Sequence, residues 1–193
     1  MKELYLPSSK EVSVVDVPKM KFLMIDGEGD PNQGSLQGSF EALFPMAYGL
    51  KFMIKKKDAK KDFKVYPPEG LWWNKDDGSF DSGPGHKWKW TLMVAQPDFV
   101  TEKMVEEVRA QAMKKKDNPL LAKVRLEEFK EGKAAQIMHI GPYDKEGPNI
   151  EKVHKVILSL GKKPNGKHHE IYMSDMRKTP PEKWKTVIRQ PFR

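Results

Sequence analysis

Apolar positions along the chain follow strand-like spacing in two places, and the local order is the same in both. In the first half, EVSVVDV (11–17), a PKM turn and KFLMIDGEGD (21–30) predict a strand, a turn and a second strand. In the second half, KVRLEEF (123–129), a KEG turn and KAAQIMHIGPYD (133–144) predict the same arrangement. A helix and further strands are expected after each.

Helical spacing of three and four follows each strand pair. The first helix is predicted from Phe40, Leu43, Ala47, Leu50 and Ile54, with a kink or restart at Pro45. The second is predicted from Ile150, Val153, Ile157 and Leu160, and Gly161 is expected to end it. Between the halves, Thr101 can cap a helix that carries Met104, Val105, Val108 and Ala112.

Four more strands complete the pattern. They are FKVYPPEGLWW (63–73), KWKWTLMVAQP (87–97), HHEIYMSD (168–175) and KTVIRQP (185–191). A weak internal sequence repeat at an offset of 114 residues supports a duplication, since Lys19, Met24, Gly27 and Asp30 recur as Lys133, Met138, Gly141 and Asp144. We therefore expect one α+β domain over residues 1–193, with two repeats at about 11–97 and 122–193. Pseudo-twofold symmetry and a central ligand groove are expected with it.

Composition narrows the class of protein. The chain has no cysteine, which excludes disulfides, thiolate catalysis and cysteine zinc sites. No apolar run approaches the ~20 residues that span a bilayer, and MKELYLPSSKEV has no signal-peptide core, so we expect a cytoplasmic protein that does not enter the membrane. The net charge is +8, but only five of the 35 basic residues are arginine. This predicts no specific nucleic-acid partner, only weak and salt-sensitive binding.

Metal and cofactor motifs are missing or incomplete. His168 and His169 are adjacent, so on a strand they face opposite sides and cannot easily share a metal. Gly27-Glu-Gly29 begins like a dinucleotide fingerprint but lacks its third glycine. We expect neither a metal nor a cofactor.

Tryptophans and one strand carry the candidate chemistry. Trp88 and Trp90 are interpreted as core residues, whereas Trp72 and Trp73 face opposite sides of a strand, so at least one can line a ligand. Glu170 and Tyr172 share one face of HHEIYMSD and would face a groove if the apolar Ile171 and Met173 face the helices. The alternative, from the residues alone, is that Glu170 is a solvated strand residue.

At this point the sequence resembles the GyrI-like small-molecule-binding family. The resemblance rests on GKAAQIMHIGPYDKEGPNIEKVHKVI with its turn from His139 to Tyr143, and on EGLWW, KWKWTLMVAQPDF and HHEIYMSD. These motifs are similar to a stand-alone subfamily that includes hydrolases of cyclopropanoid DNA-alkylating agents. The resemblance implies a ligand site with Glu170 as its glutamate, together with Tyr172, Trp72, Trp73 and Tyr143.

The resemblance leaves two functions open. The chain is either a hydrolase that opens the cyclopropane ring of such agents, with Glu170 as the catalytic residue, or a non-catalytic module that binds lipophilic, aromatic or cationic compounds. A protein-interaction role has no sequence feature in its support. We expect a monomer whose partner is a small molecule.

Overall fold

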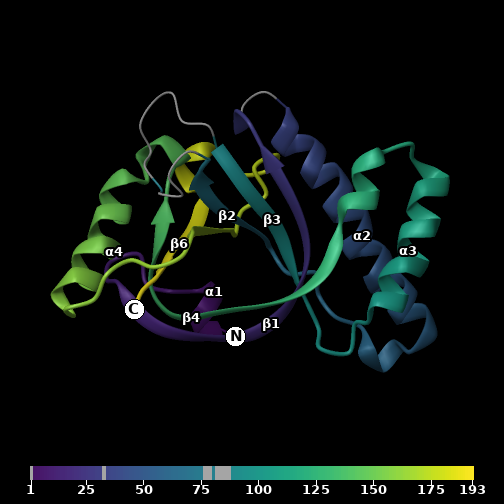
Figure 1. The fold of residues 1–193 in the computed structure, drawn as a ribbon, viewed down its shortest axis with the longest axis horizontal. Coiled ribbons are helices and arrows are strands. Elements are labelled where there is room, and N and C mark those ends of the chain that lie inside the picture. Colours follow the sequence, from purple (N-terminus) through teal and green to yellow (C-terminus); the bar gives the residue numbers. More distant parts are fainter. Residues whose placement is uncertain (1, 32–33, 76–79, 81–87) are drawn as a thin grey trace. The chain divides into compact units, whose positions relative to one another are not determined.

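The computed structural model describes residues 2–31, 34–75, 80 and 88–193 (Figure 1). The chain divides into two compact units. Unit 1 contains residues 1–19, 69–86 and 130–193, and unit 2 contains residues 20–68 and 87–129. Each unit takes segments from both predicted repeats. Lys87, the first residue of one predicted strand, lies outside the described residues.

Unit 2 is a strand pair covered by two helices. Its strands are the second part of β1 (Ser13–Glu28) and β3 (Trp88–Gln96), which pair antiparallel from Lys21–Gln96 to Glu28–Lys89. Helix α2 (Ser35–Lys57) packs on β3, and α3 (Glu102–Lys115) lies beside α2 (Figure 1). The two helices approach closely at Gly49, where a Cβ would lie 2.4 Å from the side chain of Val108.

Unit 1 contains the other strand pairs. Strand β2 (Pro68–Asn74) pairs antiparallel with β5 (His168–Tyr172), β5 with β6 (Lys185–Pro191), and β6 with β4 (Arg125–Ile140). Helix α4 (Gly147–Ser159) packs beside β6 (Figure 1), and the short helix α1 (Lys2–Tyr5) begins the chain. The predicted α+β class is therefore confirmed, with six antiparallel strands in the described residues. The pseudo-twofold symmetry and the central groove stay predictions.

The predicted turns at PKM and KEG are wrong, because β1 and β4 are each continuous strands of 16 residues. Both strands pass from one unit to the other at these points, between residues 19 and 20 and between 129 and 130. Proline lacks an amide hydrogen and glycine tolerates left-handed backbone, so Pro18 and Gly132 (φ 78°) suggested chain reversal. The structure accommodates both without one.

The helices agree with the predicted spacing. Leu43, Ala47, Leu50 and Ile54 are buried in α2, which continues through Pro45 without a restart. Thr101 caps α3, since its side chain accepts a hydrogen bond from the amide of Met104 at 3.4 Å. Gly161 has φ 69° just after α4, as a helix-ending glycine does. None of the helices in the described residues has the length and apolar character needed to cross a membrane.

The face of the sheet under α4 forms a tight apolar core. Ala135 and Ile137 of β4 and Ile188 of β6 pack with Val153 and Ile157 of α4. Ile157 is fully buried, whereas its neighbour Leu158 is 60% exposed. These adjacent residues allow the core to be tested with a matched control.

Ile157→Ala is expected to lower the free energy of unfolding by about 2–4 kcal/mol, because it removes buried methylenes and leaves a cavity. Leu158→Ala changes a side chain of similar size that already contacts water, and should cost less than about 1 kcal/mol. Urea denaturation of both variants measures the difference. Equal losses would show that α4 does not use the Ile157 face for packing.

Candidate ligand-binding site

The strand β5 presents three polar side chains on one face. His168, Glu170 and Tyr172 alternate along it, and the register places Trp72 of β2 opposite His168 and Thr186 of β6 opposite Tyr172. Because paired residues share a face of the sheet, these side chains gather at one place in unit 1.

A chain of hydrogen bonds connects them. The indole Nε1 of Trp72 donates to the hydroxyl of Tyr172 at 2.8 Å, and that hydroxyl donates to Glu170 Oε2 at 2.8 Å. The other oxygen of Glu170, Oε1, lies 3.2 Å from His168 Nε2. The ring of Phe80 stacks on His168 with centroids 3.7 Å apart. Glu170 is thus held at both oxygens and is 9% exposed.

Gly70 makes this arrangement possible. It pairs with Glu170 across β2 and β5, so any side chain there would point to the same face. A Cβ at Gly70 would lie 2.7 Å from Trp72 Nε1 and 2.9 Å from the Tyr172 hydroxyl. The missing side chain therefore leaves the room in which Trp72 and Tyr172 form their hydrogen bond.

The His139–Tyr143 turn delivers a second tyrosine to this face. His139 Nε2 lies 3.1 Å from the carbonyl oxygen of Pro142, and Asn149 Nδ2 lies 3.1 Å from His139 Nδ1. Since the amide of Asn149 donates, His139 accepts at Nδ1 and donates at Nε2. Gly141 has φ 135°, which lets the chain turn sharply there. The Tyr143 ring then meets the Tyr172 ring edge to face, with centroids 5.8 Å apart.

Two members of the cluster are not predicted from the sequence. Trp184 lies against Tyr143 with ring centroids 5.1 Å apart, and its Nε1 donates to the carbonyl of Thr179 at 2.8 Å. Glu146, at the start of α4, is 4% exposed. An acidic residue before a helix usually indicates a favourable interaction with the helix dipole, so its sequence position alone did not single it out.

The acidic groups of the cluster influence one another. Burial, and then the negative charge of Glu170, raise the pKa of Glu146 to about 10, so Glu146 carries a proton at neutral pH. Burial, and then the charges of Glu170 and Glu146, raise the pKa of Tyr143. Burial and the charge of Glu170 likewise raise the pKa of Tyr172 well above its usual value. The cluster therefore holds several proton donors around Glu170.

The apolar side of β5 does not face α4, so the condition set for Glu170 and Tyr172 to face a groove is not met. Glu170 pairs with Ile188, and Ile188 packs against α4, so Glu170 and Tyr172 share the face that α4 covers. Ile171 points to the other face and is fully buried there. The polar residues still come together, because they lie at the end of the strands beside the start of α4, where Glu146 and Tyr143 replace apolar packing.

Trp73 is not part of this cluster. It follows Trp72 on β2 and faces the opposite side, where the Lys167 ammonium lies 3.4 Å from the centre of its ring. Of the predicted ligand residues, the structure brings together Glu170, Tyr172, Trp72 and Tyr143. As for the predicted core tryptophans, Trp90 is fully buried and Trp88 is half-buried. In the part of the chain that is described, no His, Asp or Glu side chains are grouped as a metal site.

The opposite face of β5 holds a separate ionic network. His169 Nε2 lies 2.9 Å from Glu69 Oε2, and its Nδ1 lies 3.0 Å from Glu131 Oε1. Arg189 donates to Glu131 Oε2 at 3.1 Å and to the carbonyl of Leu4 at 2.5 Å. Ionised carboxylates only accept, so both ring nitrogens of His169 donate and the imidazole is charged. Two cations and two anions balance in this buried network.

Comparison with known proteins identifies the family of this chain. The model of the GyrI-like small molecule binding domain matches residues 10–193, which is nearly the whole chain. The chain belongs to the GyrI-like family. As a GyrI-like domain, it is a small-molecule-binding protein, and the predicted resemblance is confirmed.

Solved GyrI-like structures are similar over the full length. An uncharacterised conserved protein from Listeria innocua is 39% identical, with a TM-score of 0.91, and the match covers 100% of this chain and 96% of that one. A protein described as a hydrolase from Listeria innocua is 37% identical, with a TM-score of 0.87 and the same coverage. The EcmrR C-terminal domain shares the fold at 14% identity, with a TM-score of 0.58 and coverage of 95% and 97%. No curated protein matches this GyrI-like chain.

The ionic network predicts how stability depends on pH. Burial lowers the pKa of His169, but the charge of Glu131 and hydrogen bonds to Glu131 and Glu69 outweigh burial and raise it to about 9. The folded protein thus holds this proton more tightly than the unfolded chain, whose histidine pKa is about 6.5. Its contribution is complete below pH ~6.5 and is lost as the pH rises through about 9, and it amounts to at most about 3 kcal/mol.

We expect the urea midpoint of the wild type to decrease as the pH is raised from 6.5 to 9.5. His169→Gln should be less stable than the wild type at pH 6.5, and its urea midpoint should decrease much less over the same pH range. Glu146 contributes a decrease of the same sign in both proteins, so the difference between the two curves isolates His169. A wild-type curve parallel to that of His169→Gln would show that His169 does not change its protonation on folding in this range.

Proposed function

We propose that this chain is a hydrolase that opens the cyclopropane ring of cyclopropanoid DNA-alkylating agents and so protects the cell. The support is the combination of Glu170 with aromatic rings and proton donors in one cluster, and the similarity over the full length to a protein described as a hydrolase. The reacting group of such an agent is a strained cyclopropane ring conjugated to a carbonyl group. Its hydrolysis needs a positioned water, a base and a donor, but no covalent nucleophile.

In this proposal the aromatic rings hold the flat substrate. Tyr143 and Tyr172 are half-buried and perpendicular to each other, and Trp184 extends the surface beside Tyr143. Rings arranged in this way provide both a face for stacking and an edge. Holding the substrate in one orientation brings the strained carbon within reach of a water at Glu170.

Glu170 is proposed as the base. It removes a proton from the attacking water as the water oxygen bonds to the ring carbon and the cyclopropane carbon–carbon bond breaks. The electrons of that bond move to the conjugated carbonyl oxygen, which must then receive a proton. Protonated Glu146, Tyr143 or Tyr172 can supply it, because burial and neighbouring charge keep all three protonated at neutral pH. Water is added overall, and no other reactant is needed.

A second candidate function is binding without turnover. Glu170 has no lysine or arginine partner within the described part of the chain; its neighbours are Tyr172, His168 and the protonated Glu146. A buried carboxylate beside aromatic rings attracts a lipophilic cation, since the rings and the charge both favour it. The same cluster would then sequester aromatic cations. Turnover separates the two functions, because a binder saturates at one equivalent and an enzyme consumes an excess.

The test is to incubate the protein with an excess of a cyclopropanoid alkylator and to follow the addition of one water by mass spectrometry. We expect many turnovers with the wild type, and Glu170→Gln to lower kcat by roughly 100-fold or more, because the base is lost while the shape is kept. Glu182→Gln is the control, since this residue is exposed and outside the cluster. Circular dichroism verifies folding.

A product yield that stops at one equivalent would reject the hydrolase and favour the binder. In that case Glu170→Gln should weaken the binding of a cationic dye and leave the binding of a neutral aromatic ligand unchanged. If the folded Glu170→Gln protein keeps both turnover and dye affinity, Glu170 belongs to neither function.

Glu146 gives an independent prediction. Glu146→Gln removes a transferable proton, so kcat should fall by about 10-fold or more. Stability at pH 8 should not fall, because the raised pKa of Glu146 already makes its ionisation unfavourable in the folded state. Steady-state kinetics measures the change in kcat, and urea denaturation at pH 8 measures the change in stability. A variant that is destabilised but turns over normally would assign Glu146 a structural role only.

A further inference from the structure

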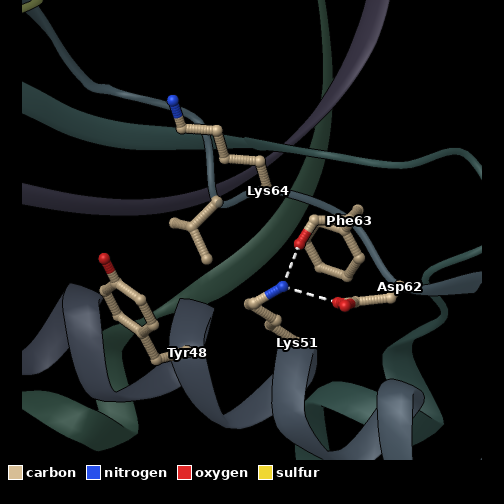
Figure 2. Close-up of a pocket in the computed structure, with 6 residues that line it drawn as sticks. Tyr48, Lys51, Asp62, Phe63 and Lys64 are labelled. Atoms are coloured by element: carbon tan, nitrogen blue, oxygen red, sulfur yellow. Dashed lines mark hydrogen bonds and ion pairs between the residues drawn. The ribbon is translucent and has the colours of Figure 1, made fainter. Parts of the chain in front are cut away.

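A hollow lies in unit 2, separate from the cluster around Glu170. It has a volume of about 410 Å³ and is lined by Tyr48 and Lys51 of α2 and by residues 62–65, which follow that helix. Figure 2 shows the Tyr48 ring and the Phe63 ring on either side of Lys51, with Lys64 above them. This volume lies in the range of about 300–1,000 Å³ that is usual for small-molecule sites.

The walls of the hollow are fixed to one another. Lys51 donates to Asp62 Oδ1 at 2.5 Å and also to the carbonyl oxygen of Phe63 (Figure 2). Lys55 lies 3.0 Å from the other oxygen of Asp62. Phe63 meets Phe99 edge to face, with ring centroids 6.3 Å apart. The segment after α2 is therefore tied to the helix, and the hollow needs no large rearrangement before it binds a ligand.

Tyr48 is held in place by its neighbours on α2. Phe44 and Phe52 lie one turn away on either side, with ring centroids 6.4 Å and 6.2 Å from that of Tyr48. The Tyr48 side chain is nevertheless 46% exposed. A large ring that is ordered and still open to solvent provides a surface on which a flat ligand can stack.

The charges around the hollow favour an anion. Among the described residues that line the hollow, Asp62 is the one carboxylate, and hydrogen bonds from Lys51 and Lys55 lower the pKa of Asp62 to about 2, so it stays ionised beside two lysines. Lys64 has no carboxylate partner among the described residues and lies on the rim. Among the described residues, the hollow thus combines apolar aromatic walls with an excess of positive charge, and Lys64 is the ammonium group on its rim.

We propose that this hollow binds a small planar aromatic anion, with its ring against Tyr48 and Phe63 and its carboxylate or sulfonate at Lys64. The charge preference is opposite to that of the Glu170 cluster, so the two sites would take different ligands. The site does not depend on the proposed hydrolase activity.

The test is calorimetric titration with 2-naphthoate, and with 2-naphthylmethylammonium as a cation of the same ring size. We expect the anion to bind and the cation to bind at least 5-fold more weakly. Lys64→Met should weaken the binding of 2-naphthoate at least 5-fold. Lys56 is exposed and does not line the hollow, so Lys56→Met should change this affinity less than 2-fold. Tyr48→Ala should weaken the binding of 2-naphthoate more than Phe52→Ala does.

Three results would overturn the proposal. The first is no binding of 2-naphthoate at millimolar concentration. The second is equal binding by the wild type, Lys64→Met and Tyr48→Ala, with folding verified by circular dichroism. The third is loss of 2-naphthoate binding in Glu170→Gln, which would place the anion at the other cluster; Glu170→Gln is expected to bind it as the wild type does.

Discussion

The alternation of side chains along β5 determines what each face of this part of the sheet can do. Within five residues, His168, Glu170 and Tyr172 point to one side, while His169 and Ile171 point to the other. On the second side, the charges of His169 and its partners cancel within a buried network. On the first, Glu170 is surrounded by His168, aromatic rings and hydroxyl groups, and no lysine or arginine among the described residues pairs with it. A slip of one residue in the register would exchange the two environments.

The two faces depend on each other energetically. A carboxylate that is 9% exposed and has no lysine or arginine partner in the described part of the chain is costly to keep in place. The network on the other face, which joins β2, β5 and β6 through Glu69, His169 and Arg189, holds the strands that carry it. The protonated state of Glu146 limits the cost further, since only one of the two neighbouring carboxyl groups needs to be charged. Stability on one side thus supports an energetically unfavourable arrangement of charges on the other.

Local pattern predicted much of this structure, and long-range pairing explains what it missed. Helix spacing, the Thr101 cap and the shared face of Glu170 and Tyr172 follow from periods of 3.6 and 2, which are local properties. These local periods do not predict whether that face points toward α4 or away from it, because this depends on which side of the sheet α4 covers. The local pattern does not reveal Glu146 and Trp184 either, because tertiary packing places Glu146, at the start of α4, beside Glu170, and Trp184, just before β6, beside Tyr143. Pro18 and Gly132 suggested turns that continuous strands override.

We propose that the cluster around Glu170 is the place where this GyrI-like domain binds its small molecule. The most direct measurement is a crystal structure with a flat aromatic cation such as acridine orange. We expect the dye rings to lie within ~4–4.5 Å of Tyr143 and Tyr172, and the charge of the dye within ~6 Å of the Glu170 carboxylate. A dye bound at full occupancy elsewhere, with no dye in this cluster, would show that the cluster is not the ligand site.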